Sequence, residues 1–461
     1  MNSAVDPSNL DPRHRSALLP GDHPDRMQLA WEVHARPPEA LTTPSRATYV
    51  AVLVDSESRE QELRQLEELC REFGVAGPAA GASHHSANLG ELLIKWERHG
   101  EFSGYTFVAT GIGRTPFCDP PAAHLPTGWL AAVPGRTIFA ANSELIPSRD
   151  ASDASAQILG AYFGENVAIG SIVGGGAGCV YTDFRIHPDG FARFLLIDRS
   201  FTSRQVGRMM QRLFEIEAYR MLALLALPIA REQWPRISEL ERSLLALITG
   251  ISREDGDDET TLHQLTRLAK EIESCIVSTQ FRFGACAAYH ELVTTRIGEL
   301  REQRLEGVPT IEEFMTRRFS PAVATVANAS RRLNDLSNRV AQACALLATR
   351  VGIAREKQNQ ALLESMNRRA RQQLRLQQTV ESLSLAAILY YLAGLVGYLS
   401  KGLKANGYRI DPDVVVGVAI LPLALVLVYT LRKMKRSSRD DVLEGAVLVG
   451  RVGIEPTTKG L

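Results

Sequence analysis

Two uncharged apolar runs near the C-terminus constrain this chain more than any other feature of its sequence. Residues 382–400 read SLSLAAILYYLAGLVGYLS, and residues 414–431 read VVVGVAILPLALVLVYTL. At a rise of about 1.5 Å per residue, each would form a helix of roughly 27–28 Å, close to the ~30 Å hydrocarbon core of a bilayer. Both runs are apolar on every face, which is not typical of surface helices. We therefore predict transmembrane helices at 382–403 and 414–431, joined by an extracytoplasmic loop at 404–413.

Basic residues lie on both outer sides of this predicted hairpin. The connecting loop is short and mixed in charge. Because loops rich in Lys and Arg stay in the cytoplasm, both ends of the chain are expected there. We expect a two-pass protein of the bacterial inner membrane, with the bilayer as its first partner. The flanking residues are Arg368, Arg369, Arg371 and Arg375 before the first run, and Arg432, Lys433, Lys435 and Arg436 after the second.

Small residues within the first run indicate where this helix meets a neighbour. Gly394 and Gly397 lie three residues apart, with Tyr398 next to them. Small residues at such spacing let two membrane helices approach closely, either in an anchor or in the wall of a pore. Neither run contains an acidic residue, and intramembrane charges usually mark a transport path. The pattern favours an anchor.

The rest of the composition excludes some classes of function. Lys plus Arg and Asp plus Glu each number 52, so the formal net charge is zero and no nucleic-acid partner is expected. Residues 1–20 lack an apolar core of signal-peptide length, and we expect a disordered, cytoplasmic N-terminus. The basic tail at 432–461 ends in GRVGIEPTTKGL, which resembles a spurious extension from about residue 439 onward.

The pattern of residues 21–200 predicts a mixed α/β domain. Runs rich in β-branched and aromatic residues alternate with helical patterns. A Pro188-Asp189-Gly190 turn predicts an antiparallel hairpin between the last two runs. The glycine-rich segment 174–178 precedes a strand and lacks a following helix, so it predicts a hairpin turn rather than a phosphate loop. Strands are predicted at 47–55, 104–110, 166–173, 179–187 and 191–198, and helices at 58–73 and 91–98.

Two groups of polar residues in this domain are candidates for chemistry. His23, Glu32 and His34 could ligate a metal if the chain is extended there, and hydrogen-bonded structural residues are the alternative. Glu97, His99 and Glu101 recur at period two and could form a carboxylate–imidazole cluster for acid/base work. The alternative is a polar strand edge with Trp96 and Phe102 packed beneath. We find no known catalytic motif, name no cofactor, and expect a non-enzymatic protein.

Residues 201–381 are predicted to form a helical bundle and stalk. Helices are expected at 202–230, 237–249 and 261–304, with an acidic loop at 253–259. From residue 321 to 394 one helical pattern runs on, interrupted only by Gly352. Its apolar residues Leu333, Leu336, Val340, Ala343 and Leu347 follow the 3-4-3 spacing of a coiled coil or bundle. A helix of this length needs partners, either within the chain or from other copies, and we expect a homo-oligomer through the stalk.

Several segments resemble a known bacterial family. They include HPDRMQLAWEVHARPP, IKWERHGEFSGYTF, TDFRIHPDGFARF, GRMMQRLFEIEAYRMLALLALPIARE and TVESLSLAAILYYLAGLVGYLSKGL. The chain is similar over residues 20–436 to predicted membrane-anchored proteins that share a domain of unknown function. That resemblance implies a membrane anchor and assigns no chemistry.

The order of segments also resembles that of CorA-type magnesium channels. Those channels close their first span with a Gly-Met-Asn motif, whereas this chain reads Gly397-Tyr398-Leu399-Ser400-Lys401. We therefore expect a membrane-anchored scaffold, sensor or partner-binding module. A divergent homo-oligomeric channel and a membrane-anchored metal-dependent enzyme are the alternatives. The sequence names no protein partner.

Overall fold

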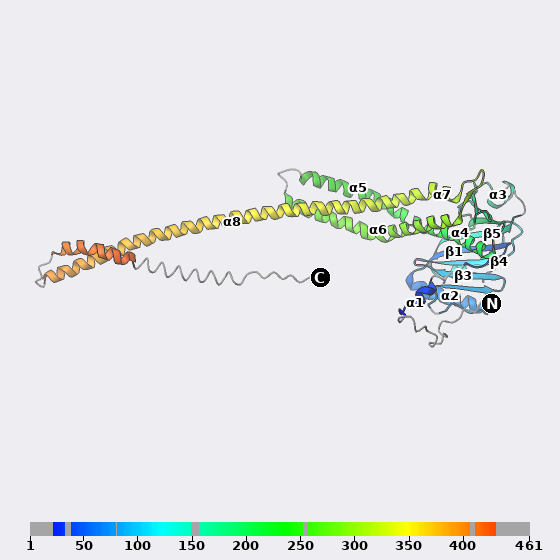
Figure 1. The fold of residues 1–461 in the computed structure, drawn as a ribbon, viewed down its shortest axis with the longest axis horizontal. Helices are drawn as coiled ribbons and strands as arrows, with labels where there is room; N and C mark the ends of the chain where they lie inside the picture. The colour runs from blue at the N-terminus through cyan, green and yellow to red at the C-terminus, as the bar shows by residue number, and fades with distance from the viewer. Residues whose placement is uncertain are drawn as a thin grey trace. The chain divides into compact units, whose positions relative to one another are not determined.

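The computed structural model describes residues 22–32, 38–79, 81–148, 156–251, 257–405 and 411–429. It divides into two compact units, Met1–Leu347 and Ala348–Leu461. The first unit combines a nine-stranded sheet with long helices, as predicted for a mixed α/β protein (Figure 1).

The sheet is mixed and mostly antiparallel. Its strand order is β2-β3-β4-β1-β5-β8-β7-β6-β9, and β5 and β8 form its one parallel pair among the described residues. The last strand comes from far along the chain, after three long helices. The strands are β1 (Ser45–Leu53), β2 (His84–Leu89), β3 (Leu92–Arg98), β4 (Phe102–Thr110), β5 (Arg136–Pro147), β6 (Ile169–Val173), β7 (Gly178–Thr182), β8 (Ala192–Asp198) and β9 (Gln303–Arg304).

All five predicted strands are present, as β1, β4, β6, β7 and β8. The predicted pairing of β7 with β8 is confirmed. The glycine-rich turn is also confirmed, since Gly174, Gly175 and Gly176 have positive φ between β6 and β7. A side chain at Gly174 would meet the Phe201 ring, with a Cβ only 2.5 Å from its Cε1. The long β5 and the edge strand β2 were not predicted.

The helix predicted at 91–98 is wrong, because this segment is strand β3. Gly90 has φ of 78° and makes the turn from β2, and β3 then pairs with β2 and β4. Side chains alternate along it: Ile94 and Trp96 pack on one face, whereas Lys95 lies on the other. Both faces of the strand are covered, so Leu92 and Leu93 are both apolar, and the alternation of Ile94, Lys95, Trp96 and Glu97 that follows is short.

Helices cover both faces of the sheet. Helix α2 (Arg59–Glu72), predicted at 58–73, packs on the face that carries Ile94 and Trp96. Helix α4 (Ser203–Leu224) packs on the opposite face, where Tyr49 of β1 stacks on Phe214 with ring centroids 4.9 Å apart. The short α1 (Arg26–Glu32) precedes the sheet, and α3 (Ala156–Phe163) follows β5.

Long helices follow the sheet, and their ends are set by local signals. A capping box of Thr202 and Gln205 starts α4. The single helix predicted at 202–230 is instead two, because α4 ends at Leu224 and α5 (Ala226–Ile251) starts with Pro228 in its first turn. Helix α6 (Asp258–Leu300) begins at the Asp257 cap, and the short α7 (Ile311–Arg318) follows β9.

Helix α8 (Ser320–Ala405) is continuous over 86 residues, as predicted from its pattern. Its predicted apolar seam is buried in the first unit, together with residues of α5 and α6. Between α6 and α8 lies an apolar groove of about 380 Å³. The seam residues are Leu333, Leu336, Val340, Ala343 and Leu347.

In the second unit, one helix among the described residues is long and apolar enough to cross a membrane. It is Pro412–Tyr429, with a mean hydropathy of 2.2. The first predicted span falls within α8, and the side chains at 381–383, 385 and 386 lie outside the described residues. So do residues 406–410 of the predicted loop and the tail from 430 onward. The two-span hairpin therefore stays a prediction.

Candidate functional site: a buried polar network between the sheet and two helices

Two charged residues of β3 point into the layer between the sheet and α4. Lys95 and Glu97 are each only 6 % exposed, and Lys95 Nζ lies 3.0 Å from Glu97 Oε1. Burying charges in this way is costly unless they are paired. Lys95 also donates a hydrogen bond to Gln211 Oε1 on α4 at 3.3 Å, so the pair joins a larger network.

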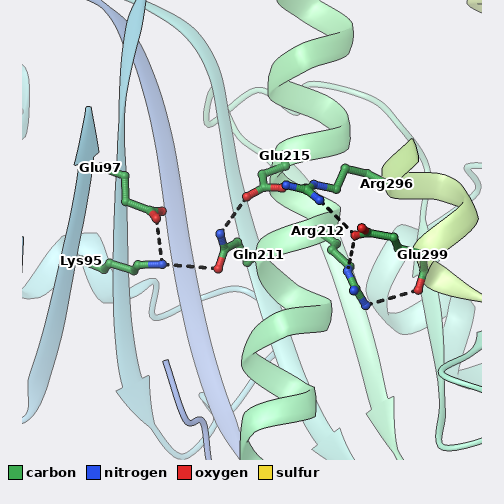
Figure 2. Close-up of polar contacts among 7 residues, drawn as sticks. All are labelled: Lys95, Glu97, Gln211, Arg212, Glu215, Arg296 and Glu299. Atoms are coloured by element: carbon green, nitrogen blue, oxygen red, sulfur yellow. Dashed lines mark hydrogen bonds and ion pairs between the residues drawn. The ribbon is translucent and has the colours of Figure 1, made fainter. Parts of the chain in front are cut away.

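The network continues along α4 and crosses to α6 (Figure 2). Gln211 Nε2 donates to Glu215 Oε1 at 2.7 Å, as expected for residues four apart on one helix face. The other oxygen of Glu215 accepts a hydrogen bond from Arg296 of α6. A single chain of contacts thus connects the sheet with both helices.

The α6 end of the network has two arginines and one carboxylate. Arg296 donates to Glu299 Oε2 at 3.1 Å, and Arg212 Nε donates to the same oxygen at 2.9 Å. Arg212 also donates to the Glu299 backbone oxygen at 3.3 Å (Figure 2). Arg212 and Glu299 come from different helices, so this contact fixes α4 against α6.

Burial dominates the electrostatics of this network. Desolvation raises the pKa of the Glu215 carboxyl, and Arg296 and Gln211 oppose part of this rise. Burial also raises the pKa of Tyr49 and Tyr219, which lie near Glu97 and Glu215. The network therefore holds one carboxyl that keeps its proton to a higher pH than a solvated Glu does.

The free space beside these charges is small. A cavity of about 30 Å³ lies between β3 and α4, lined by Lys95, Glu97, Gln211 and Glu39 among others. Such a volume suits a single water molecule with polar partners. The site as it stands can bind water or exchange a proton.

A second polar contact fixes the turn between β3 and β4 to α6. Glu101 pairs with Arg282 and accepts a hydrogen bond from Tyr289 Oη at 3.1 Å. Tyr289 also stacks on Tyr219 of α4, with ring centroids 5.7 Å apart. The turn is thereby held by α6 at two side chains.

A comparison with protein families identifies the chain's relatives. Residues 21–438 match the model of the family described as "Protein of unknown function (DUF3422)". The chain belongs to this family. No curated protein and no solved structure matches the chain. The DUF3422 match includes every strand and helix described above, so the polar network lies wholly within the family region.

Within this DUF3422 domain, the period-two residues of the β3–β4 hairpin have three different partners. Glu97 pairs with Lys95, and Glu101 with Arg282. His99 stacks on Phe102 with ring centroids 4.3 Å apart. They do not converge on one point as an acid/base cluster would.

The N-terminal metal candidates are only partly within the described residues. His23 is exposed, and its Nδ1 accepts a hydrogen bond from the Asp25 backbone N–H at 3.2 Å. Glu32 ends helix α1, its side chain is not described, and His34 lies outside the described residues. Within the ranges that the structure describes, no group of three or more His, Cys, Asp or Glu residues could hold a metal ion.

The residues predicted for helix packing lie in the second unit. A Cβ at Gly397 would lie 3.4 Å from Val416 Cγ2, so α8 and the helix Pro412–Tyr429 approach each other there. Gly394 has no atom within 4 Å of such a Cβ, and Tyr398 is 78 % exposed. Arg368, Arg369, Arg371 and Arg375 are exposed on α8, and the basic residues at 432–436 lie outside the described residues.

Most of the network was not predicted. Glu97 is the one member that the sequence pattern singled out. One signal was available: Lys95 stands between Ile94 and Trp96 in a chain with few lysines. A lysine within an apolar strand indicates a partner on the covered face. The other unpredicted members are Gln211, Arg212, Arg296 and Glu299.

Replacing Glu215 with glutamine is expected to change how stability depends on pH. Because burial raises the folded-state pKa of Glu215, the native protein binds more protons than the unfolded chain between about pH 4.3 and that raised value. Wild-type stability therefore falls as pH rises through this window, and Glu215→Gln removes that contribution. When melting temperatures are measured at several pH values, the melting temperature of the variant should rise relative to that of wild type as pH increases. A constant difference would contradict the burial argument.

Proposed function

We propose that the chain is a non-enzymatic, two-pass protein of the bacterial inner membrane whose body binds a partner or acts as a scaffold or sensor. The close approach of Gly397 to Val416 carries the membrane part of this proposal. It joins the apolar end of α8 to Pro412–Tyr429, the helix with membrane-spanning hydropathy. Two apolar helices that pack at a glycine are what a membrane hairpin requires.

The state of the polar network supports a binding role over a catalytic one. Its charged groups are engaged with one another: Lys95 with Glu97, and Glu215 with Arg296. The adjoining cavity of about 30 Å³ has room for water alone. Such a network fixes α4 and α6 to the sheet. It thereby also fixes the position of the surface that α6 and α8 offer to a partner.

Membrane anchoring can be tested by fractionation and topology reporters. The full chain should stay in the membrane pellet after alkaline carbonate extraction, and a version ending at residue 381 should be released. A reporter fused after Arg436 should be active only in the cytoplasm, because both flanks are basic. A periplasmic signal would mean an odd number of spans and would contradict the two-pass arrangement.

The subunit count separates an anchor from a channel. Two spans per chain cannot enclose an aqueous path, so a pore requires several copies around one axis. Native mass spectrometry of the detergent-purified chain should give a small oligomer such as a dimer. A ring of about five copies would contradict the anchor proposal and favour an ion channel.

A further inference from the structure

Helix α8 carries a band of arginines between Glu364 and Glu381. Between residues 365 and 380 the chain contains four arginines and no Asp or Glu. Within the described part of the second unit, all four are exposed and none forms an ion pair with a carboxylate. We call Arg368, Arg369, Arg371 and Arg375 the arginine band.

The spacing of the band concentrates positive charge on one side of the helix. Arg368, Arg371 and Arg375 are three and four residues apart, which places them on one face. Like charges at this spacing repel one another and destabilise an isolated helix. An anionic ligand that bridges them would relieve this repulsion.

The band stands just before the apolar run. Arg375 and Arg371 precede Ser382 by 7 and 11 residues, or about 10 and 16 Å along a helix. A bilayer's headgroup layer extends roughly 5–7 Å beyond its hydrocarbon core on each side, and the surface potential decays over about 8 Å. Long arginine side chains reach towards such a surface. Arg368, about 21 Å away, can act only through the longer-range field.

We propose that the arginine band binds the phosphates of anionic phospholipid headgroups, with Arg375 in direct contact and Arg371 next in distance. The proposal rests on the proposed function, since the apolar end of α8 must enter the bilayer. Guanidinium groups suit this ligand because they bind phosphate oxygens in a bidentate manner. The contribution of each arginine to the affinity for anionic lipid should fall with its distance from the apolar run.

Lipid retention tests this site directly. The full-length chain is extracted from vesicles of equal parts phosphatidylglycerol and phosphatidylethanolamine, and bound lipids are counted by native mass spectrometry. Wild type should be enriched in phosphatidylglycerol. A charge near the membrane surface contributes about fivefold in affinity, and this contribution decays with distance. R371Q/R375Q should therefore reduce the enrichment by between about fivefold and 25-fold. The more distant pair, R368Q/R369Q, should reduce it less than fivefold.

Matched variants separate a phosphate site from bulk charge. R331Q/R339Q removes two exposed arginines from α8 far from the apolar run and should leave the enrichment unchanged. R371K/R375K keeps the charge but loses the bidentate geometry, and should give an intermediate value. Equal losses in all glutamine variants, or no enrichment in wild type, would overturn the proposal. Gln and Arg have similar helix propensities, so the variants should fold alike.

The two proposals fail in different ways. If wild type were released by alkaline carbonate, the membrane anchor itself would be wrong. If all variants stayed in the pellet while the lipid ratio never changed, the anchor would stand and the lipid site would be wrong.

Discussion

Replacing Gly207 with alanine is expected to destabilise the α/β domain strongly. Gly207 is buried on α4, and a Cβ there would lie 1.7 Å from the backbone oxygen of Glu39. The neighbouring Leu41 N–H donates to Ser203 O at 3.0 Å, so the segment before β1 lies directly on the helix. The backbone oxygen of Glu39 cannot move aside as the end of a flexible side chain could. We expect the free energy of unfolding to fall by more than about 3 kcal/mol. Circular dichroism should show this as a large drop in melting temperature.

A second helical glycine provides the matched control. Gly284 of α6 is exposed, and a Cβ there would meet no atom within 4 Å. Gly284→Ala should stabilise the protein by roughly 0.5–1 kcal/mol, because alanine favours the helix. If Gly207→Ala behaved like Gly284→Ala, the packing of the 38–44 segment on α4 would be wrong.

Replacing Glu62 with leucine should lower the free energy of unfolding by about 3–5 kcal/mol, because three hydrogen-bond donors lose their buried carboxylate acceptor. Glu62 of α2 is 1 % exposed. Its Oε1 accepts hydrogen bonds from Trp96 Nε1 at 3.1 Å and Tyr105 Oη at 2.7 Å, and its Oε2 accepts one from Arg59 at 3.2 Å. Glu62→Leu leaves these buried donors without their acceptor. Thermal or urea unfolding followed by tryptophan fluorescence would measure the loss.

Two further variants test whether the acceptor oxygen is responsible. Glu62→Gln keeps one carbonyl oxygen and should cost less than the leucine variant. Glu68→Leu changes an exposed residue of the same helix and should stay within about 0.5 kcal/mol of wild type. Equal losses for Glu62→Leu and Glu68→Leu would rule out the buried contacts as the cause.

Periodicity predicted the helices of this fold better than its strands. The 3-4-3 seam of α8 and the Leu66–Leu69 face of α2 could be read because each has one buried side. Strand β3 was taken for a helix although Ile94 and Trp96 alternate with Lys95 and Glu97, because both its faces are covered and the run begins with two adjacent apolar residues, Leu92 and Leu93. The parallel pairing of β5 with β8 depends on contacts about fifty residues apart, which local pattern does not specify.

The site was less predictable than the fold. Glu97 was selected for its spacing, but its neighbours Gln211 and Glu215 come more than a hundred residues later. Gln211 and Glu215 are four residues apart, which predicts that they share one face of a helix. This spacing does not predict whether that face contacts water or another element. Only the packing of α4 between the sheet and α6 decides this, and it makes Glu215 buried.

The position of β9 at the sheet edge sets an order of events during synthesis. Its residues pair with Ser171 and Ile172 of β6, so the edge of β6 stays open until the ribosome has passed Arg304. An open strand edge invites pairing with other chains. The first apolar run starts 78 residues later, which at roughly 5–20 residues per second is about 4–16 s of translation. The nascent chain can therefore close its sheet before its first apolar run has been made.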